Sequence, residues 1–341
     1  MALTPSGTIK YSEIIAEFGT PNNGGLGEFR LSESVGTLTN LPLDTGVPQT
    51  GQIKFSDFYS KRLNQVVDLY STSVNNTSRQ NAKDRWNNGN VHIVGSSKTG
   101  KTQPPDTEED RVIINVNATI SSAKGTQTHC ALRTGNWDTN TTLEIEIGTS
   151  GKLYGSGGDG GSGGSANETA GTDGQTGSSA LGIQYPCTVN NLGVIQSGYG
   201  GGGGGGGNTR TTGGGKKSGA TTNGSSGGGG GGGAGLPAGS AGGVQTPLSA
   251  GGGSAGSAGA AGSLSGQATG GAGGSEAGDG GNSSPVNNSA TKADNGTSPS
   301  GAAAFGTGGN NGYAIITNQG SAPSVTGNSA TGRIITSTNP T

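Results

Sequence analysis

The order of apolar and polar positions divides the chain at about residue 150. Before that point, short stretches alternate between apolar and polar residues, most clearly over residues 113–120 and 143–147, which is typical of half-buried strands. Segments rich in Asn, Gly and Pro separate these stretches. We therefore predict a small β-sandwich attachment domain over residues 63–150. Its expected strands cover residues 65–70, 91–95, 111–121, 127–133 and 142–147.

A shorter pattern occurs three times before residue 60. It runs Gly, any residue, Ile or Phe, Lys or Arg, a large apolar residue, Ser and an acid, starting at Gly7, Gly27 and Gly51. The pattern predicts a short strand followed by a helical turn, with the serine as N-cap and the acid near the positive helix end. We expect a small αβ docking module over residues 1–62, although a compact cap without a docking role would give the same pattern. The candidate docking residues are Ile9, Tyr11, Ser12, Phe29, Leu31, Ser32, Ile53, Phe55 and Ser56.

Glycine dominates the chain after residue 150, where most of its 75 glycines lie. Between residues 155 and 164, two columns of glycines recur every third residue, and the third column is polar. Residues 253–262 have one glycine column with the same spacing, beside a column led by serines and a column of alanines, and residues 200–207 and 227–233 are all glycine. Three residues is the period of the polyproline-II helix, and bare glycine faces allow chains to approach closely. We expect a sandwich of polyglycine-II helices over residues 151–341, with the pure glycine runs at its centre; a flexible linker is the alternative.

The predicted receptor-contacting residues lie in the polar loops between these runs, because recognition usually occurs on loops carried by a rigid scaffold. The expected loops cover residues 167–185, 208–226, 236–250, 264–269 and 282–300. Their Arg, Lys, Thr and Asn residues suit a sugar phosphate or an acidic glycan, although the basic residues could equally serve solubility alone. The candidates are Tyr185, Arg210, Lys216, Lys217, Asn223, Lys292 and Asn295.

Composition narrows the classes of function. The chain has a net charge of −2 and 27% hydrophobic residues, which gives no electrostatic footprint for nucleic acid. We expect no signal peptide and no membrane-spanning segment, because no long apolar stretch occurs. Cys130 and Cys187 are expected to be free thiols.

Candidate catalytic motifs are weak. Residues 95–102 match the P-loop pattern, but Pro104 and Pro105 follow where the phosphate-binding helix would begin, so we interpret the segment as a turn-forming loop. His92, His129 and Cys130 match no zinc-ligand spacing. Glu144 and Glu146 share one strand face and are interpreted as surface residues. We therefore predict no enzyme activity, no metal and no cofactor.

Two strings carry a resemblance to a known family. Residues 189–200, which run into a glycine tract, and residues 312–317 resemble the receptor-recognition adhesins at the tail-fibre tips of T-even-type bacteriophages. The repeated N-terminal pattern resembles the first segments of tail and fibre proteins of cyanobacterial-type phages. The overall fold class expected is mainly β and irregular, with an αβ docking module, a β-sandwich and a polyglycine-II sandwich.

The resemblance implies a function and a set of partners. The chain would be a non-enzymatic adhesin in the virion tail or fibre tip, made in the host cytoplasm. The loops at the far end of the glycine sandwich would bind a host outer-membrane protein or lipopolysaccharide glycan. The first 150 residues would attach to a tail or fibre protein, and the three repeats would suit a trimeric one. A structural tail component with a rigid glycine spacer and an ice-binding protein are the alternatives.

Overall fold

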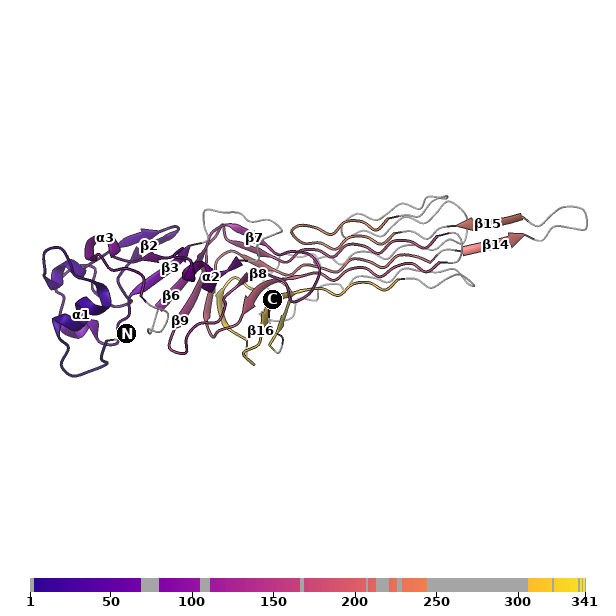
Figure 1. Cartoon of the computed structure of the whole chain (residues 1–341). Helices are drawn as coiled ribbons and strands as arrows, with labels where there is room; N and C mark the ends of the chain where they lie inside the picture. Colours follow the sequence, from indigo (N-terminus) through magenta and orange to yellow (C-terminus); the bar gives the residue numbers. More distant parts are fainter. Residues whose placement is uncertain are drawn as a thin grey trace, which may run out of the picture.

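The computed structural model describes residues 3–68, 80–104, 111–165, 169–206, 208–212, 221–225, 229–243, 306–320, 322–336, 338 and 340. These residues form three parts along one long axis: an N-terminal module, a body of strands, and extended glycine-rich segments that end in a hairpin (Figure 1). The protein is mainly β, as expected, and its α-helices are short: α1 (Tyr11–Phe18), α2 (Ala82–Asn87) and α3 (Ser96–Thr99).

The body is a coil of parallel strands. The chain enters three sheets in turn and then repeats the same order, so that each sheet gains one strand per round. The first complete round is β6 (Arg111–Val116), β7 (Thr119–Ser121) and β8 (Cys130–Arg133). The second round is β9 (Thr142–Ile147), β10 (Lys152–Tyr154) and β11 (Ser179–Ile183), and the third is β12 (Thr188–Asn191), β13 (Val194–Gln196) and β16 (Tyr313–Thr317). Strands of successive rounds pair in parallel.

Short strands complete the two ends of the coil. At one end, β3 (Asn64–Asp68) and β4 (Gln80–Asn81) pair with the first round, and β5 (His92–Ile93) pairs antiparallel with β3. At the other end, β17 (Ser324–Gly327) and β18 (Arg333–Ile335) pair with the third round. A single bridge between Gln196 and Thr331 continues the remaining sheet.

The apolar core lies between the three sheets. Alternate side chains of each strand point inward, and the parallel register places similar residues above one another. Ile114 aligns with Ile145, and Ile145 aligns with Val189. All three are almost completely buried. Burial of the inward face explains the alternation of β9. In β6 the other face is covered as well, because Ile113 is buried in a second cluster with Val35, Val66 and Val94.

The expected strands before residue 150 are present with shifted bounds, but their arrangement differs from the predicted sandwich. The pairing is almost all parallel, and β9 pairs directly with β12, which follows residue 150. The coil therefore crosses the expected boundary between residues 150 and 151. Strands β10–β13 are short and lie beside glycine-rich sequence, which is why alternation alone did not reveal them.

The N-terminal module has an apolar core of its own. It contains α1, two 3₁₀ turns, η1 (Leu26–Phe29) and η2 (Phe55–Phe58), and a hairpin of β1 (Glu33–Val35) and β2 (Leu38–Leu41). The rings of Phe18, Phe29 and Phe58 lie 5.6–6.2 Å apart with tilted or edge-to-face geometry, which favours aromatic packing. Leu63 and Ile93 of the adjoining chain join this core.

The repeated N-terminal pattern folds differently from the expectation. In the first and third copies the helical turn begins at Tyr11 and Phe55, so that the basic residue, not the serine, is the N-cap. The residues before each turn are not strands. In the second copy no helix follows Ser32, because Glu33 begins β1. A related turn occurs instead at η1, which lies partly before that copy.

The glycine-rich segments form a stack, which we define as residues 155–164, 171–178, 198–206, 229–234, 237–243 and 306–312. Backbone hydrogen bonds join these segments at every third residue. The N–H groups of Gly155, Gly158, Gly161 and Gly164 donate to one neighbour, at Gln196, Tyr199, Gly202 and Gly205. Those of Gly157, Gly160 and Gly163 donate to another, at Pro237, Ser240 and Gly243. Residues 198–206 are all buried.

Glycine is required in the stack because neighbouring backbones occupy the space of a side chain. A Cβ atom at Gly161 would lie 1.9 Å from the Thr172 carbonyl oxygen, and one at Gly204 would lie 1.9 Å from the Ser162 carbonyl oxygen. Each distance is far below a van der Waals contact. At these positions glycine allows neighbouring segments of the chain to approach closely, and it does not serve flexibility.

We expect Gly204→Ala to destabilise the stack by about 1–3 kcal/mol or more, as overpacking in a close-packed interior does. Gly243→Ala is the matched control, because among the described residues its Cβ would meet only the Ser162 hydroxyl, at 3.7 Å. Thermal unfolding of the purified variants measures the difference. Equal unfolding temperatures for the two variants would contradict the close-approach explanation.

Candidate functional site

The stack projects from one corner of the coil. The chain twice leaves the sheet of β10 and β13 and returns to the sheet of β11 and β16. It does so once between β10 and β11 and once between β13 and β16. The coil thus carries the stack as two insertions in consecutive rounds. Figure 1 shows the stack extending away from the coil and the N-terminal module.

Polar groups join the stack to the coil. The hydroxyls of Ser122, Ser156 and Ser178 form a buried cluster in which Ser156 and Ser178 lie 2.8 Å apart. Nearby, the Asp159 carboxylate accepts from Lys124 Nζ at 2.6 Å and from the Ser240 N–H at 2.6 Å. Burial alone would raise the pKa of Asp159, but the bonds from Lys124 and Ser240 outweigh it and lower that pKa.

Side-chain bonds also tie the segments near the far end of the stack. The hydroxyls of Ser165 and Thr169 lie 2.8 Å apart, just beyond the far ends of segments 155–164 and 171–178. The Asp173 carboxylate accepts from the Thr307 N–H at 2.7 Å and from its hydroxyl at 2.8 Å, and these bonds lower the pKa of Asp173. The returning segment 306–312 is thereby fixed beside segment 171–178.

A polar hairpin lies beyond the end of the stack. It consists of β14 (Asn208–Thr212) and β15 (Thr221–Ser225), which pair antiparallel. Arg210 pairs with Asn223, both predicted site residues, so the structure brings these two together. Figure 1 shows the hairpin at the end of the molecule opposite the N-terminal module. We take this end of the stack, with its hairpin, as the candidate functional site.

Other predicted loop residues lie elsewhere. Tyr185 follows β11 in the coil, where it is half-buried and its hydroxyl donates to the Thr141 carbonyl at 3.0 Å. The expected loop at residues 167–185 is largely an extended stack segment followed by β11. The turn at residues 235–238 faces the coil, since the Leu236 N–H donates to the Gly155 carbonyl at 3.0 Å. Lys216, Lys217, Lys292 and Asn295 lie outside the described residues.

The predicted docking residues divide into core and surface. Ile9, Phe29 and Leu31 are buried in the core of the N-terminal module. Tyr11 and Ile53 are half-buried, and Ser12, Ser32, Phe55 and Ser56 are exposed. Sequence periodicity alone did not separate the two groups, because the turns begin two residues earlier than expected.

The P-loop match has a structural role. Its segment contains the single helical turn of α3, whose C-cap is Gly100, instead of the expected loop without a helix. The Lys101 ammonium group donates to the Ala16 carbonyl at 2.6 Å. Lys101 therefore satisfies a carbonyl near the C-terminus of α1, where a cation is favourable.

The titratable residues considered from the sequence have separate partners, although burial and the neighbouring Glu144 carboxylate both raise the pKa of Glu146. Glu144 pairs with Arg111 at 2.7 Å, whereas Glu146 accepts from Asn190 at 2.8 Å. His92 contacts Glu33 at 3.1 Å. Within the described part of the chain, no group of three or more His, Cys, Asp or Glu residues could hold a metal ion. No helix of that part has the length and apolar character needed to cross a membrane.

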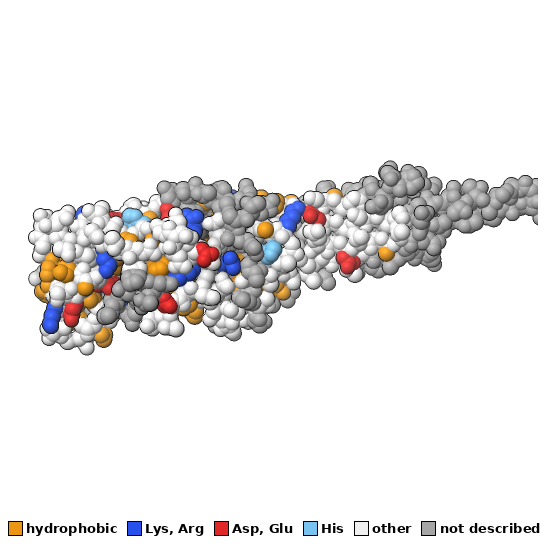
Figure 2. Space-filling view, viewed as in Figure 1, with side chains coloured by type: hydrophobic (Ala, Val, Ile, Leu, Met, Phe, Trp, Pro, Cys, Tyr) orange, Lys and Arg blue, Asp and Glu red, His pale blue; other side chains and the backbone are white. Residues whose placement is uncertain are grey.

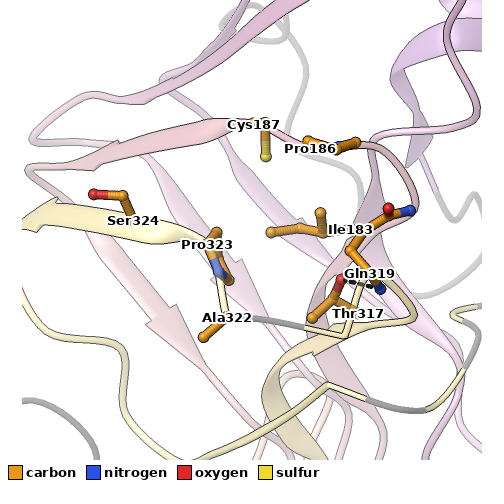
Figure 3. A pocket seen from close by; sticks show the side chains of 8 residues that line it. All are labelled: Ile183, Pro186, Cys187, Thr317, Gln319, Ala322, Pro323 and Ser324. Carbon is orange, nitrogen blue, oxygen red and sulfur yellow. Dashed lines mark hydrogen bonds between the residues drawn. The ribbon is translucent and has the colours of Figure 1, made fainter. Parts of the chain in front are cut away.

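A half-open cavity of about 190 Å³ lies at the corner where β11 leads to β12 and β16 leads to β17 (Figure 3). Pro186 and Pro323 line it from successive rounds of the coil, and Cys187 points toward it. Burial raises the pKa of the Cys187 thiol to about 12, so this sulfur stays protonated and poorly nucleophilic at neutral pH.

Comparison with known proteins gives two matches. A family model described as phage tail fibre adhesin Gp38 matches residues 81–335. A solved structure, the gp37–gp38 adhesin tip complex of the bacteriophage S16 long tail fibre, contains a chain 18% identical to this one. The match covers 86% of this chain and 89% of that chain, with a TM-score of 0.32. A search of curated proteins finds no match.

We expect Asp159 to make part of the stability pH-dependent. A carboxyl whose pKa is lowered by folding stabilises the protein above its unfolded pKa, and this contribution is lost as the pH falls through the folded pKa. Asp159→Asn should therefore lower the unfolding temperature at about pH 7 and have a smaller effect at about pH 3. Asp138→Asn, at an exposed position, is the control. An equal loss at both pH values would show that the charge is not responsible.

Proposed function

Because the chain belongs to the phage tail fibre adhesin Gp38 family, we propose that it recognises a receptor on the host cell surface. The observation that carries the proposal is the position of the polar hairpin. It lies at the end of a hydrogen-bonded stack, far from the N-terminal module (Figure 1). A surface so placed is free to reach a cell while the other end remains attached to a virion.

The proposal includes polyglycine-II helices as the elements of the stack. Their support is the period of three in the hydrogen bonds, where Gly155, Gly158 and Gly161 face one neighbour and Gly157 and Gly160 face another. A helix with three residues per turn presents every third residue to the same side. At roughly 3.1 Å per residue, segment 155–164 would hold the tip about 30 Å from the coil.

The proposed receptor surface consists of the hairpin and the other loop residues that the sequence predicts. Arg210 and Asn223 are its described members, and Lys216, Lys217, Lys292 and Asn295 complete the proposed set. Arginine, lysine and amide groups can bind the phosphates and hydroxyls of a lipopolysaccharide glycan or the polar loops of an outer-membrane protein. Tyr185 is not retained, because it is half-buried in the coil and hydrogen-bonded to Thr141.

The mechanism we propose is binding without chemistry. Polar loops on a scaffold that is already ordered lose little conformational entropy on contact, which favours affinity. The opposite end, including the N-terminal module, would attach to a tail or fibre protein in the virion. In this proposal the chain is not an enzyme, and its partners are the host receptor and that virion protein.

The main competing function is a rigid spacer within the tail, which the same stack would also support. The two functions differ in whether the hairpin contacts the host. Replacing residues 210–223 by Asn-Gly closes the hairpin between Thr209 and Gly224, which already pair, with a two-residue turn suited to hairpins. The stack and coil should keep their unfolding temperature in this variant.

We expect the shortened hairpin to weaken binding of the purified protein to host cells by about tenfold or more, because losing a central contact set costs about 2 kcal/mol or more. Flow cytometry with labelled protein measures this. Leu192→Ser, at an exposed position on the coil, is the control and should bind like the parent. Unchanged binding by a correctly folded shortened variant would favour the spacer.

A further inference from the structure

The corner of the coil that carries the stack is built differently in the first round. There the chain passes from β7 to β8 through a short connection, residues 122–129, which we name the corner loop. In the next two rounds the corresponding connections contain the stack. Bonds within the corner loop keep it compact, since the His129 ring contacts the Lys124 carbonyl at 3.2 Å and the His129 N–H donates to the Thr126 carbonyl at 3.3 Å. The loop is therefore an ordered turn beside the base of the stack.

Three side chains of the corner loop contact the stack. Ser122 belongs to the buried serine cluster at the base of the stack. The Lys124 ammonium group donates to the Asp159 carboxylate at 2.6 Å, in segment 155–164. The Gln127 side-chain amide donates to the Asn311 carbonyl at 2.5 Å, in the returning segment. One short loop of the coil thus contacts segments that lie far apart in the sequence.

The two stack residues that accept from Lys124 and Gln127 also bond to further segments. The same Asp159 oxygen accepts from the Ser240 N–H at 2.6 Å. The Asn311 side-chain oxygen accepts from the Gly200 N–H at 3.0 Å. Directly or through one residue, the corner loop is therefore linked to segments 155–164, 171–178, 198–206, 237–243 and 306–312.

The ion pair of the corner loop lies at the point where the molecule narrows. Figure 2 shows a basic and an acidic side chain side by side where the broad part of the molecule passes into the stack. The Lys124 and Asp159 side chains are 27% and 31% exposed, so water and salt screen this pair less than a fully exposed one. A support beside the base matters because the stack is long. A tilt of about 10° moves a tip about 30 Å away by about 5 Å.

We infer that Lys124 and Gln127 are positioning residues for the receptor surface, because they hold the stack at a fixed angle to the coil. They touch no receptor, and they act through Asp159 and Asn311. A tip whose direction is already set loses less freedom when it binds. The inference rests on the proposed function in taking the far end of the stack as the receptor surface.

The test measures the distance between the coil and the far end of the stack by pulsed electron paramagnetic resonance. Spin labels are attached to the full chain at Leu192→Cys on the coil and at Ala170→Cys near the far end, both exposed positions. Cys130 and Cys187 are replaced by alanine. We expect the parent to give one narrow distribution, and Lys124→Met with Gln127→Leu to broaden or shift it by several ångströms, as the tilt estimate implies.

The matched control is Lys152→Met with Gln52→Leu, which changes the same residue types at exposed positions away from the corner loop. Its distribution should equal that of the parent. Lys124→Arg, which keeps the cation, should also preserve the parent distribution. An unchanged distribution in the loop variant, or an equal change in the control, would overturn the inference. If the loop variant fails to unfold cooperatively, Lys124→Met and Gln127→Leu are measured singly, and unchanged distances in both would overturn it as well.

Host-cell binding then separates this inference from the receptor proposal. The loop variant should bind cells about twofold to tenfold more weakly than the parent, the size expected when freedom must be lost on binding. Changed distances with unchanged binding would overturn the positioning role. A parent that fails to bind cells would reject the receptor proposal, whereas the distances would still show whether the corner loop fixes the angle of the stack.

Discussion

Close approach between backbones that carry no side chains is the constraint on which the rest of the structure depends. The stack buries almost no apolar side chains. Its segments must therefore be held in place by hydrogen bonds and dense packing against neighbouring segments of the same chain. A Cβ at Gly158 or Gly306 would overlap a carbonyl oxygen at 1.9–2.0 Å. Ordering glycine costs more backbone entropy than ordering any other residue, and a single isolated segment could not offset that cost. The segments therefore order together, with residues 198–206 bonded to four neighbouring segments.

The coil supplies what the stack lacks, namely an apolar core and a fixed starting geometry. Its parallel register places Ile114, Ile145 and Val189 in one inward row. Burial of these side chains fixes the orientation of the strands, and so the direction in which the chain leaves each of them. Because both insertions leave from the same corner, adjacent segments begin at hydrogen-bonding distance. The buried hydroxyls of Ser156 and Ser178 and the Lys124–Asp159 pair hold the first residues of the stack in place.

Local features were predictable from the sequence, whereas long-range pairing was not. The alternation at residues 143–147 predicted β9 correctly, and the spacing of the glycines at 155–164 predicted which residues share a neighbour. The coil was missed because parallel pairing joins residues far apart, such as Asn190 with Thr326, and leaves no local signature. At the candidate site, the sequence identified Arg210 and Asn223 as members of polar loops but could not show their pairing. Tyr185 was misplaced because a polar loop and a half-buried corner residue have similar sequence surroundings.

The period of three in the stack limits how this protein can change in evolution. Insertions of any length beyond the far ends of the segments leave the hydrogen-bonded columns aligned, because both flanking segments keep their register. An insertion of one or two residues within segment 155–164 would instead rotate the remaining glycines away from their partners and point Asp159 or Ser162 at a neighbouring backbone. Length variation should therefore accumulate at the tip, while the segments that carry it change by whole turns of three residues.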